Sequence, residues 1–158
     1  MDDRARFVTT WEKEAATTRK VISRIPEGSD YRPDPKSRTA REIAWLIVRE
    51  DMVLVEGLEK GRLEWAEEPV PASVKEILDV YDRHQARSAD RLKRLDAASW
   101  ERDIPFVFQG QEVMKAPGGD NAWGFLLDQI HHRGQLTTYL RPMGSTVPQI
   151  YGPSADEP

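Results

Sequence analysis

Four long stretches of the sequence carry apolar residues at the spacing of an amphipathic α-helix, and segments rich in proline and glycine separate them. The first stretch runs from Phe7 to Ile25 and stops at Pro26. The others cover residues 39–58, 73–95 and 120–140. Each stretch is long enough to bury one face against the other three. The pattern therefore predicts an all-α chain folded as a four-helix bundle.

Residues that can cap a helix N-terminus stand directly before three of these stretches. They are Ser37 or Thr39 before the second, Ser73 before the third, and Asp120 or Asn121 before the fourth. Glu76, three residues after Ser73, completes the pattern of a capping box. These side chains predict where the helices begin.

Residues 96–120 lose the helical spacing because Pro105, Gly110 and Pro117 interrupt it. Within this segment, residues 104–108 are suited to a short extended piece that ends before Gln109. We therefore expect a long connection between the third and fourth helices, with a small hairpin inside it. The tail, residues 146–158, is rich in proline and is expected to be extended.

The length of 158 residues predicts a single domain that spans residues 1–158. Lys and Arg number 23 against 27 Asp and Glu, a formal net charge of −4 that disfavours a nucleic-acid-binding protein. No apolar run is long enough to span a membrane, and residues 1–20 show no secretory signal. The chain has no cysteine, so it has no thiolate nucleophile of its own. These features lead us to expect a cytoplasmic protein.

Several polar residues point inward on the predicted helices. Glu50 lies on the same face as Ile43 and Leu54. Asp128 and His132 are four residues apart, so they lie one above the other on the last helix. Other polar residues that interrupt or border the apolar faces are Glu14, His84, Gln85 and Ser88. If the helices align, these residues form a polar layer near the middle of the bundle.

Each of these positions has two interpretations. Glu50 and Glu14 are either structural acids with hydrogen-bond partners or members of a hydrated or metal-bound site, because an unpaired buried charge is costly. Asp128 and His132 have the spacing of two metal ligands, but a local surface pair has the same spacing. His84 is expected to make a hydrogen bond at the edge of its face rather than to bind a ligand.

Two longer motifs add a family resemblance. The first is HHRGQL at residues 131–136, which continues through TYLR at 138–141 to VPQIYG at 147–152. The second is YRPDPKSRT at residues 31–39, followed by EIAW at 42–45. By these motifs nearly the whole chain resembles the DinB-like (DinB/YfiT) superfamily. The resemblance implies a four-helix bundle of up-down-down-up topology, commonly a homodimer, with a divalent metal held near its centre by three side chains.

In this superfamily the metal is typically held by one His of the second helix and by two residues four apart on the fourth. By position, Asp128 and His132 match the second pair, with Asp in place of the usual His or Glu. Leu46 stands where the second-helix His is usual, and leucine cannot ligate a metal. Glu50, one turn further along the same face, is our hypothesis for the third ligand, which would make a set of one His and two carboxylates.

Members of known activity include mycothiol- and bacillithiol-dependent transferases and the mycothiol-dependent maleylpyruvate isomerase, in which the metal serves thiol chemistry. The resemblance thus implies a metal-dependent thiol transferase, with nickel, zinc, iron or manganese as its ion and a low-molecular-weight thiol as its cofactor. Arg133 is a candidate for binding a substrate anion, or alternatively for pairing with a carboxylate at the dimer seam.

Two alternatives to an enzyme stay open. The first is a non-catalytic homodimer that has lost its metal and binds a small ligand in the same cleft, lined by Trp45, Trp123 and Tyr139. The second is a structural or stress-response protein without a ligand. Neither alternative involves DNA, because the chain is acidic overall.

Overall fold

The structure is a computed structural model that describes residues 2–158, and Met1, with which the predicted domain begins, lies outside the described residues. Across the described residues the chain forms five helices and three strands, and 57% of it is helical. In chain order these are α1 (Asp3–Ile22), α2 (Ala40–Lys60), β1 (Leu63–Trp65), α3 (Val74–Arg94), α4 (Ala97–Glu101), β2 (Asp103–Phe108), β3 (Gln111–Pro117) and α5 (Gly118–Leu140). The expectation of a mostly helical chain is confirmed, but the all-α class is wrong because a small sheet is present.

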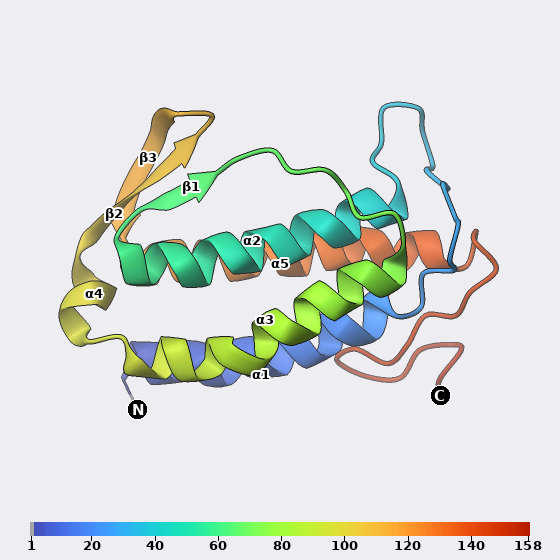
Figure 1. Cartoon of the computed structure of the whole chain (residues 1–158). Coiled ribbons are helices and arrows are strands. Elements are labelled where there is room, and N and C mark those ends of the chain that lie inside the picture. Colours follow the sequence, from blue (N-terminus) through green and yellow to red (C-terminus); the bar gives the residue numbers. More distant parts are fainter. Residues whose placement is uncertain (1) are drawn as a thin grey trace.

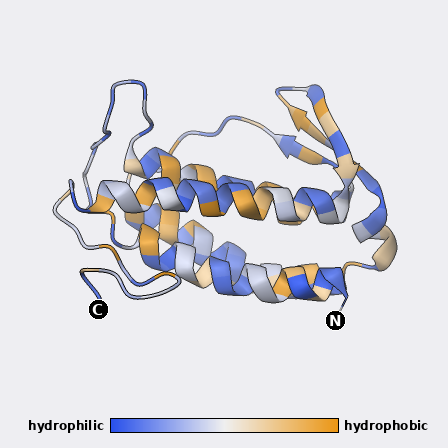
Figure 2. Cartoon of the chain, turned by 180° about the vertical axis from the view of Figure 1, so that it is seen from behind, coloured by the Kyte–Doolittle hydropathy of each residue, from blue (hydrophilic) through white to orange (hydrophobic). Residues whose placement is uncertain are grey.

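The four long helices pack as two pairs. Helix α2 lies beside α5, α1 lies beside α3, and the two pairs contact each other (Figure 1). Helices α1 and α5 run in one direction and α2 and α3 in the other (Figure 1). Each long helix carries both hydrophobic and hydrophilic residues, so each one has a face for the core and a face for solvent (Figure 2).

The core is divided into two apolar clusters. One cluster centres on residues such as Ile47, Tyr81 and Leu136, and the other on residues such as Leu54 and Leu126. Between the two clusters lie the buried polar residues Glu50, Asp51, Ser88, Gln129 and Arg133. The predicted polar layer in the middle of the helices is therefore present.

Local sequence explains where most helices start and stop. Thr39 and Glu42 form a reciprocal capping box at the start of α2, and Ser73 accepts a hydrogen bond from the backbone N–H of Glu76 at the start of α3. Helix α2 ends at Lys60, and Gly61 after it has a φ of 76°, the left-handed conformation that glycine adopts readily.

Helix α5 starts earlier than expected. It begins at Gly118, and no side chain caps its N-terminus, so the prediction of Asp120 or Asn121 as the cap is wrong. The amide of Asn121 instead donates to the backbone carbonyls of Ile104 and Ala116. Asn121 thus ties the helix to the two strands that precede it.

The sheet has the strand order β1-β2-β3. The predicted hairpin is present as β2 and β3, which pair antiparallel around a turn at Gln109 and Gly110. Strand β1 was not predicted; it adds in parallel to β2, with Leu63 opposite Phe106. The sheet lies at one end of the α2–α5 pair (Figure 1). Among residues 2–158, no helix has the length and apolar character that crossing a membrane requires.

Candidate metal centre

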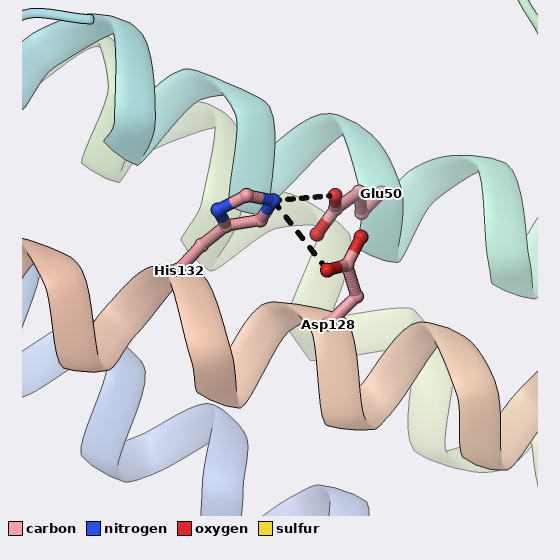
Figure 3. A group of neighbouring side chains, drawn as sticks. All are labelled: Glu50, Asp128 and His132. Atoms are coloured by element: carbon pink, nitrogen blue, oxygen red, sulfur yellow. Dashed lines mark ion pairs between the residues drawn. The ribbon is translucent and has the colours of Figure 1, made fainter. Parts of the chain in front are cut away.

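The neighbouring helices α2 and α5 bring Glu50, Asp128 and His132 together (Figure 3). Nε2 of His132 lies 3.5 Å from Oε1 of Glu50 and 3.6 Å from Oδ1 of Asp128. One ligand atom from each residue lies within 4.8 Å of the other two. The three residues that the sequence suggested as metal ligands therefore converge on one point.

The three side chains differ in exposure. Those of Glu50 and His132 are 7% and 15% exposed, whereas that of Asp128 is 57% exposed. Oε2 of Glu50 is buried and has no hydrogen-bond partner among residues 2–158. A buried carboxylate oxygen without a partner is costly, and a bound proton or cation relieves that cost.

The pKa of Glu50 is raised for the same reason. Burial of the carboxyl group, followed by the negative charge of Asp128, raises the pKa of Glu50 from 4.5 to about 9. Without a cation, Glu50 therefore carries a proton at neutral pH. A divalent ion placed among the three side chains would take the place of this proton.

The donor set fits a divalent first-row metal ion. One imidazole and two carboxylates are ligands that such ions accept, and three protein ligands leave coordination positions open. Nδ1 of His132 donates to the amide oxygen of Gln135 at 3.0 Å. This hydrogen bond leaves the lone pair on Nε2, the atom that faces Glu50 and Asp128.

A pocket of about 980 Å³ lies next to the three residues and includes all of them in its lining. Its remaining walls come from α2, from β1 and the segment that follows, from the tips of β2 and β3, and from α5. Leu46 also lines the pocket, one turn of α2 before Glu50. Any ion at this site would therefore stand at the edge of a space large enough for a small molecule.

Not every residue proposed for the ligand cleft lies there. Trp45 lines the pocket as expected. Trp123 does not: its indole N–H donates to Asp3, and its ring packs against Phe7. Tyr139 lies outside this pocket and packs edge-on against Tyr31.

Arg133 and Glu14 form a structural pair. The buried guanidinium of Arg133 lies 2.7 Å from Oε2 of Glu14 and also donates to Thr18 and Tyr151. Tyr151 donates in turn to Glu14 at 2.8 Å. Arg133 lies outside the pocket, so the role of binding a substrate anion there has no support. Its carboxylate partner is Glu14 of the same chain, and the expected place of the pair at a dimer seam stays a prediction.

A second buried polar cluster contains the expected His84, Gln85 and Ser88, but its centre, Asp51, was not predicted. The Asp51 carboxylate, which is fully buried, accepts from the indole N–H of Trp11 at 2.6 Å and from the amide of Gln85. Nε2 of His84 lies 3.1 Å from Asp51 and 3.1 Å from the hydroxyl of Ser88. The predicted hydrogen bond of His84 is thus present, and this cluster joins α1, α2 and α3.

Comparisons with known proteins agree with this architecture. The sequence profile of the DinB family matches residues 1–158. The uncharacterized protein YrdA of Bacillus subtilis (strain 168) is 34% identical in an alignment 157 positions long, which covers 96% of this chain and 89% of YrdA.

Solved structures are similar as well. A DinB-like protein from Bacillus cereus ATCC 10987 superposes with a TM-score of 0.73 at 26% identity, over 92% of this chain and 95% of that one. The DinB-like protein YjoA from Bacillus subtilis gives a TM-score of 0.71 at 18% identity, over 97% and 99% of the two chains. The chain belongs to the DinB family.

Proposed function

We propose that this protein is a divalent-metal-dependent transferase that acts on a low-molecular-weight thiol. Glu50, Asp128 and His132 would hold the ion, which is nickel, zinc, iron or manganese in this proposal. The observation that carries the proposal is the convergence of one donor atom each from Glu50, Asp128 and His132, together with the buried Oε2 of Glu50, which has no partner among the described residues. The family resemblance supports the thiol, and the absence of cysteine means that a thiol nucleophile must come from a small molecule.

The chemistry would be divided between the ion and the chain. A bound divalent ion lowers the pKa of a coordinated thiol or water and so supplies a nucleophile at neutral pH. Gln135 holds the His132 ring by its Nδ1, and Glu50 would exchange its proton for a bound cation. The pocket beside them offers aromatic walls against which a second substrate would pack.

Metal content tests the proposal directly. The untagged protein is purified without chelators or nickel resin, and its metal is measured by elemental analysis and by titration with zinc, nickel, manganese and ferrous ions. We expect near one ion per chain, and its loss in Glu50→Gln, Asp128→Asn and His132→Ala. The matched control is His131→Ala, because His131 is a neighbour outside the triad.

Three results decide among the alternatives. If His131→Ala loses the metal as readily as His132→Ala, the assigned ligands are wrong. If Glu50→Gln leaves the affinity unchanged, Glu50 is not the third ligand. If wild-type protein binds no metal even after soaking, the transferase proposal fails. The pocket then favours the alternative function of a metal-free small-ligand-binding protein.

The proposal includes a homodimer, which the family resemblance supports. Analytical ultracentrifugation measures it, since a chain of 18.1 kDa must then sediment at twice that mass. If the protein sediments as a monomer at the concentrations used for activity measurements, the homodimer is refuted.

A further inference from the structure

Aromatic rings form much of the wall of the pocket next to the metal centre. They are Trp45, Trp65, Phe106, Phe108 and Phe125. Phe106 of β2 and Phe125 of α5 meet edge to face, with ring centroids 5.5 Å apart. Leu127 and Met114 extend this surface outward and are 63% and 50% exposed. The ligand of such a pocket must present an apolar body.

The charged residues of the pocket are mainly acidic. The acids are Glu42, Glu50, Glu67, Glu68, Asp120 and Asp128, and the bases among the lining residues are Arg38 and Arg49 besides two histidines. Even when Glu50 holds its proton, carboxylates outnumber the arginines. A divalent ion that displaces this proton changes the net charge by one unit only. The pocket is therefore negative with or without its metal, and it repels anions.

Arg49 shows how the pocket accommodates a cation. Its guanidinium lies 5.8 Å from the centre of the Trp65 ring and 2.7 Å from a carboxylate oxygen of Glu68. An aromatic face combined with a carboxylate is the arrangement that holds organic cations in proteins. Glu67 and Asp120 provide further carboxylates on the same lining, and both are exposed.

We propose that this pocket binds an organic ammonium ion with an aromatic or aliphatic body, its cationic end held by the rings and the acidic rim. The inference rests on the proposed function only in placing this ligand beside a metal. Glu50, which also belongs to the proposed metal site, is a further indication of a ligand at this place. It is 6% exposed, it lines the pocket, and its Oε2 has no partner among the described residues.

The test uses two probes of one shape and opposite charge, 4-phenylbutylammonium and 4-phenylbutanoate. Their binding to the EDTA-treated protein is measured by titration calorimetry at pH 7. We expect the ammonium ion to bind about tenfold more tightly than the carboxylate. Equal affinity, a preference for the carboxylate, or no binding of either probe at millimolar concentration would overturn the proposal.

Variants locate the binding. Phe125→Ala and Phe108→Ala should each weaken ammonium binding several-fold, and Phe108 is exposed enough that its removal should leave the fold intact. Glu67→Gln should reduce the preference for the cation about two- to fivefold. The control Glu64→Gln removes an exposed carboxylate of β1 outside the pocket, and it should change nothing. If the affinity for the ammonium ion is the same in the wild type and in both phenylalanine variants, the probe binds elsewhere and the inference is refuted.

The two proposals fail separately. His132→Ala should lose the metal and keep the ammonium ion, whereas Phe108→Ala should keep the metal and lose affinity for the ammonium ion. A wild-type protein that binds metal but not the ammonium ion refutes this inference alone. One that binds the ammonium ion but no metal refutes the proposed function alone.

Discussion

Nε2 of His132 on α5 faces Oε1 of Glu50 on α2 at 3.5 Å, although the two residues are far apart in the sequence. The approach is possible because α2 and α5 are packed along much of their length. It places an imidazole lone pair against a carboxyl group that burial keeps protonated. We expect the raised pKa of Glu50 to make the stability of the protein depend on pH.

Stability of the metal-free protein should fall as the pH rises from about 4.5 to about 9. Over this range the folded protein keeps the proton of Glu50, whose pKa is raised to about 9, while the unfolded chain has released it near 4.5. The unfolded state is therefore favoured by each increase in pH. Urea unfolding in EDTA should show this slope in the wild type and a shallower one in Glu50→Gln. If the free energy of unfolding depends on pH in the same way in both proteins, Glu50 is not the source of the slope.

Leu46→His should tighten metal binding. Residue 46 lines the pocket one turn from Glu50, at the position where the superfamily usually has its histidine. An additional imidazole ligand should raise the affinity for zinc or nickel about tenfold or more. Competition with a chromogenic chelator measures the change, and Leu46→Ala is the control for the altered volume. If both variants bind metal equally, position 46 does not face the ion.

Trp11→Phe should destabilise the protein by about 1–3 kcal/mol, because it leaves a buried oxygen of Asp51 without its donor. Urea denaturation gives the free energy of unfolding. Trp123→Phe is the comparison, since Trp123 also donates its indole N–H to a carboxylate, but in an exposed hydrogen bond. A loss at Trp123 as large as that at Trp11 would show that ring size matters more than the buried hydrogen bond.

Two glycines of α5 should respond oppositely to alanine. A Cβ on Gly119 would lie 2.6 Å from Nε1 of Trp100, so Gly119→Ala should cost about 1–3 kcal/mol. A Cβ on Gly134 meets no atom of the described residues within 4 Å, so Gly134→Ala should stabilise the helix by up to about 1 kcal/mol. Denaturant midpoints of the two variants test this. Shifts of the same sign would mean that α5 does not lie against Trp100 as described.

The predicted helices follow from signals that are local in the sequence. Apolar spacing and the caps at Thr39 and Ser73 are contained within single helices, so the sequence was sufficient to place them. The convergence of Glu50 with Asp128 and His132 needed one more step, the packing of two helices through a shared polar layer. The family resemblance paired the two helices through Asp128 and His132, and the inward direction of Glu50 on its helix added the third residue.

The features that were missed depend on distant parts of the chain. Strand β1 has three residues, and it pairs with β2 after α3 and α4 have intervened, so no local pattern marks it. Asp51 follows Glu50 directly, but successive helix residues point about 100° apart. Its side chain therefore reaches Trp11 and Gln85 on α1 and α3, while Glu50 faces α5. A helix pattern that assigns a single buried face to α2 could not predict that both Glu50 and Asp51 are buried.

The sheet and the helices contribute different parts of the same cavity. Glu50, Asp128 and His132 stand on α2 and α5, whereas Trp65, Phe106 and Phe108 stand on strands inserted between helices. Connecting segments tolerate changes in length and sequence better than packed helices do. Substitutions between the helices should therefore change which molecules the cavity accepts and leave Glu50, Asp128 and His132 in place.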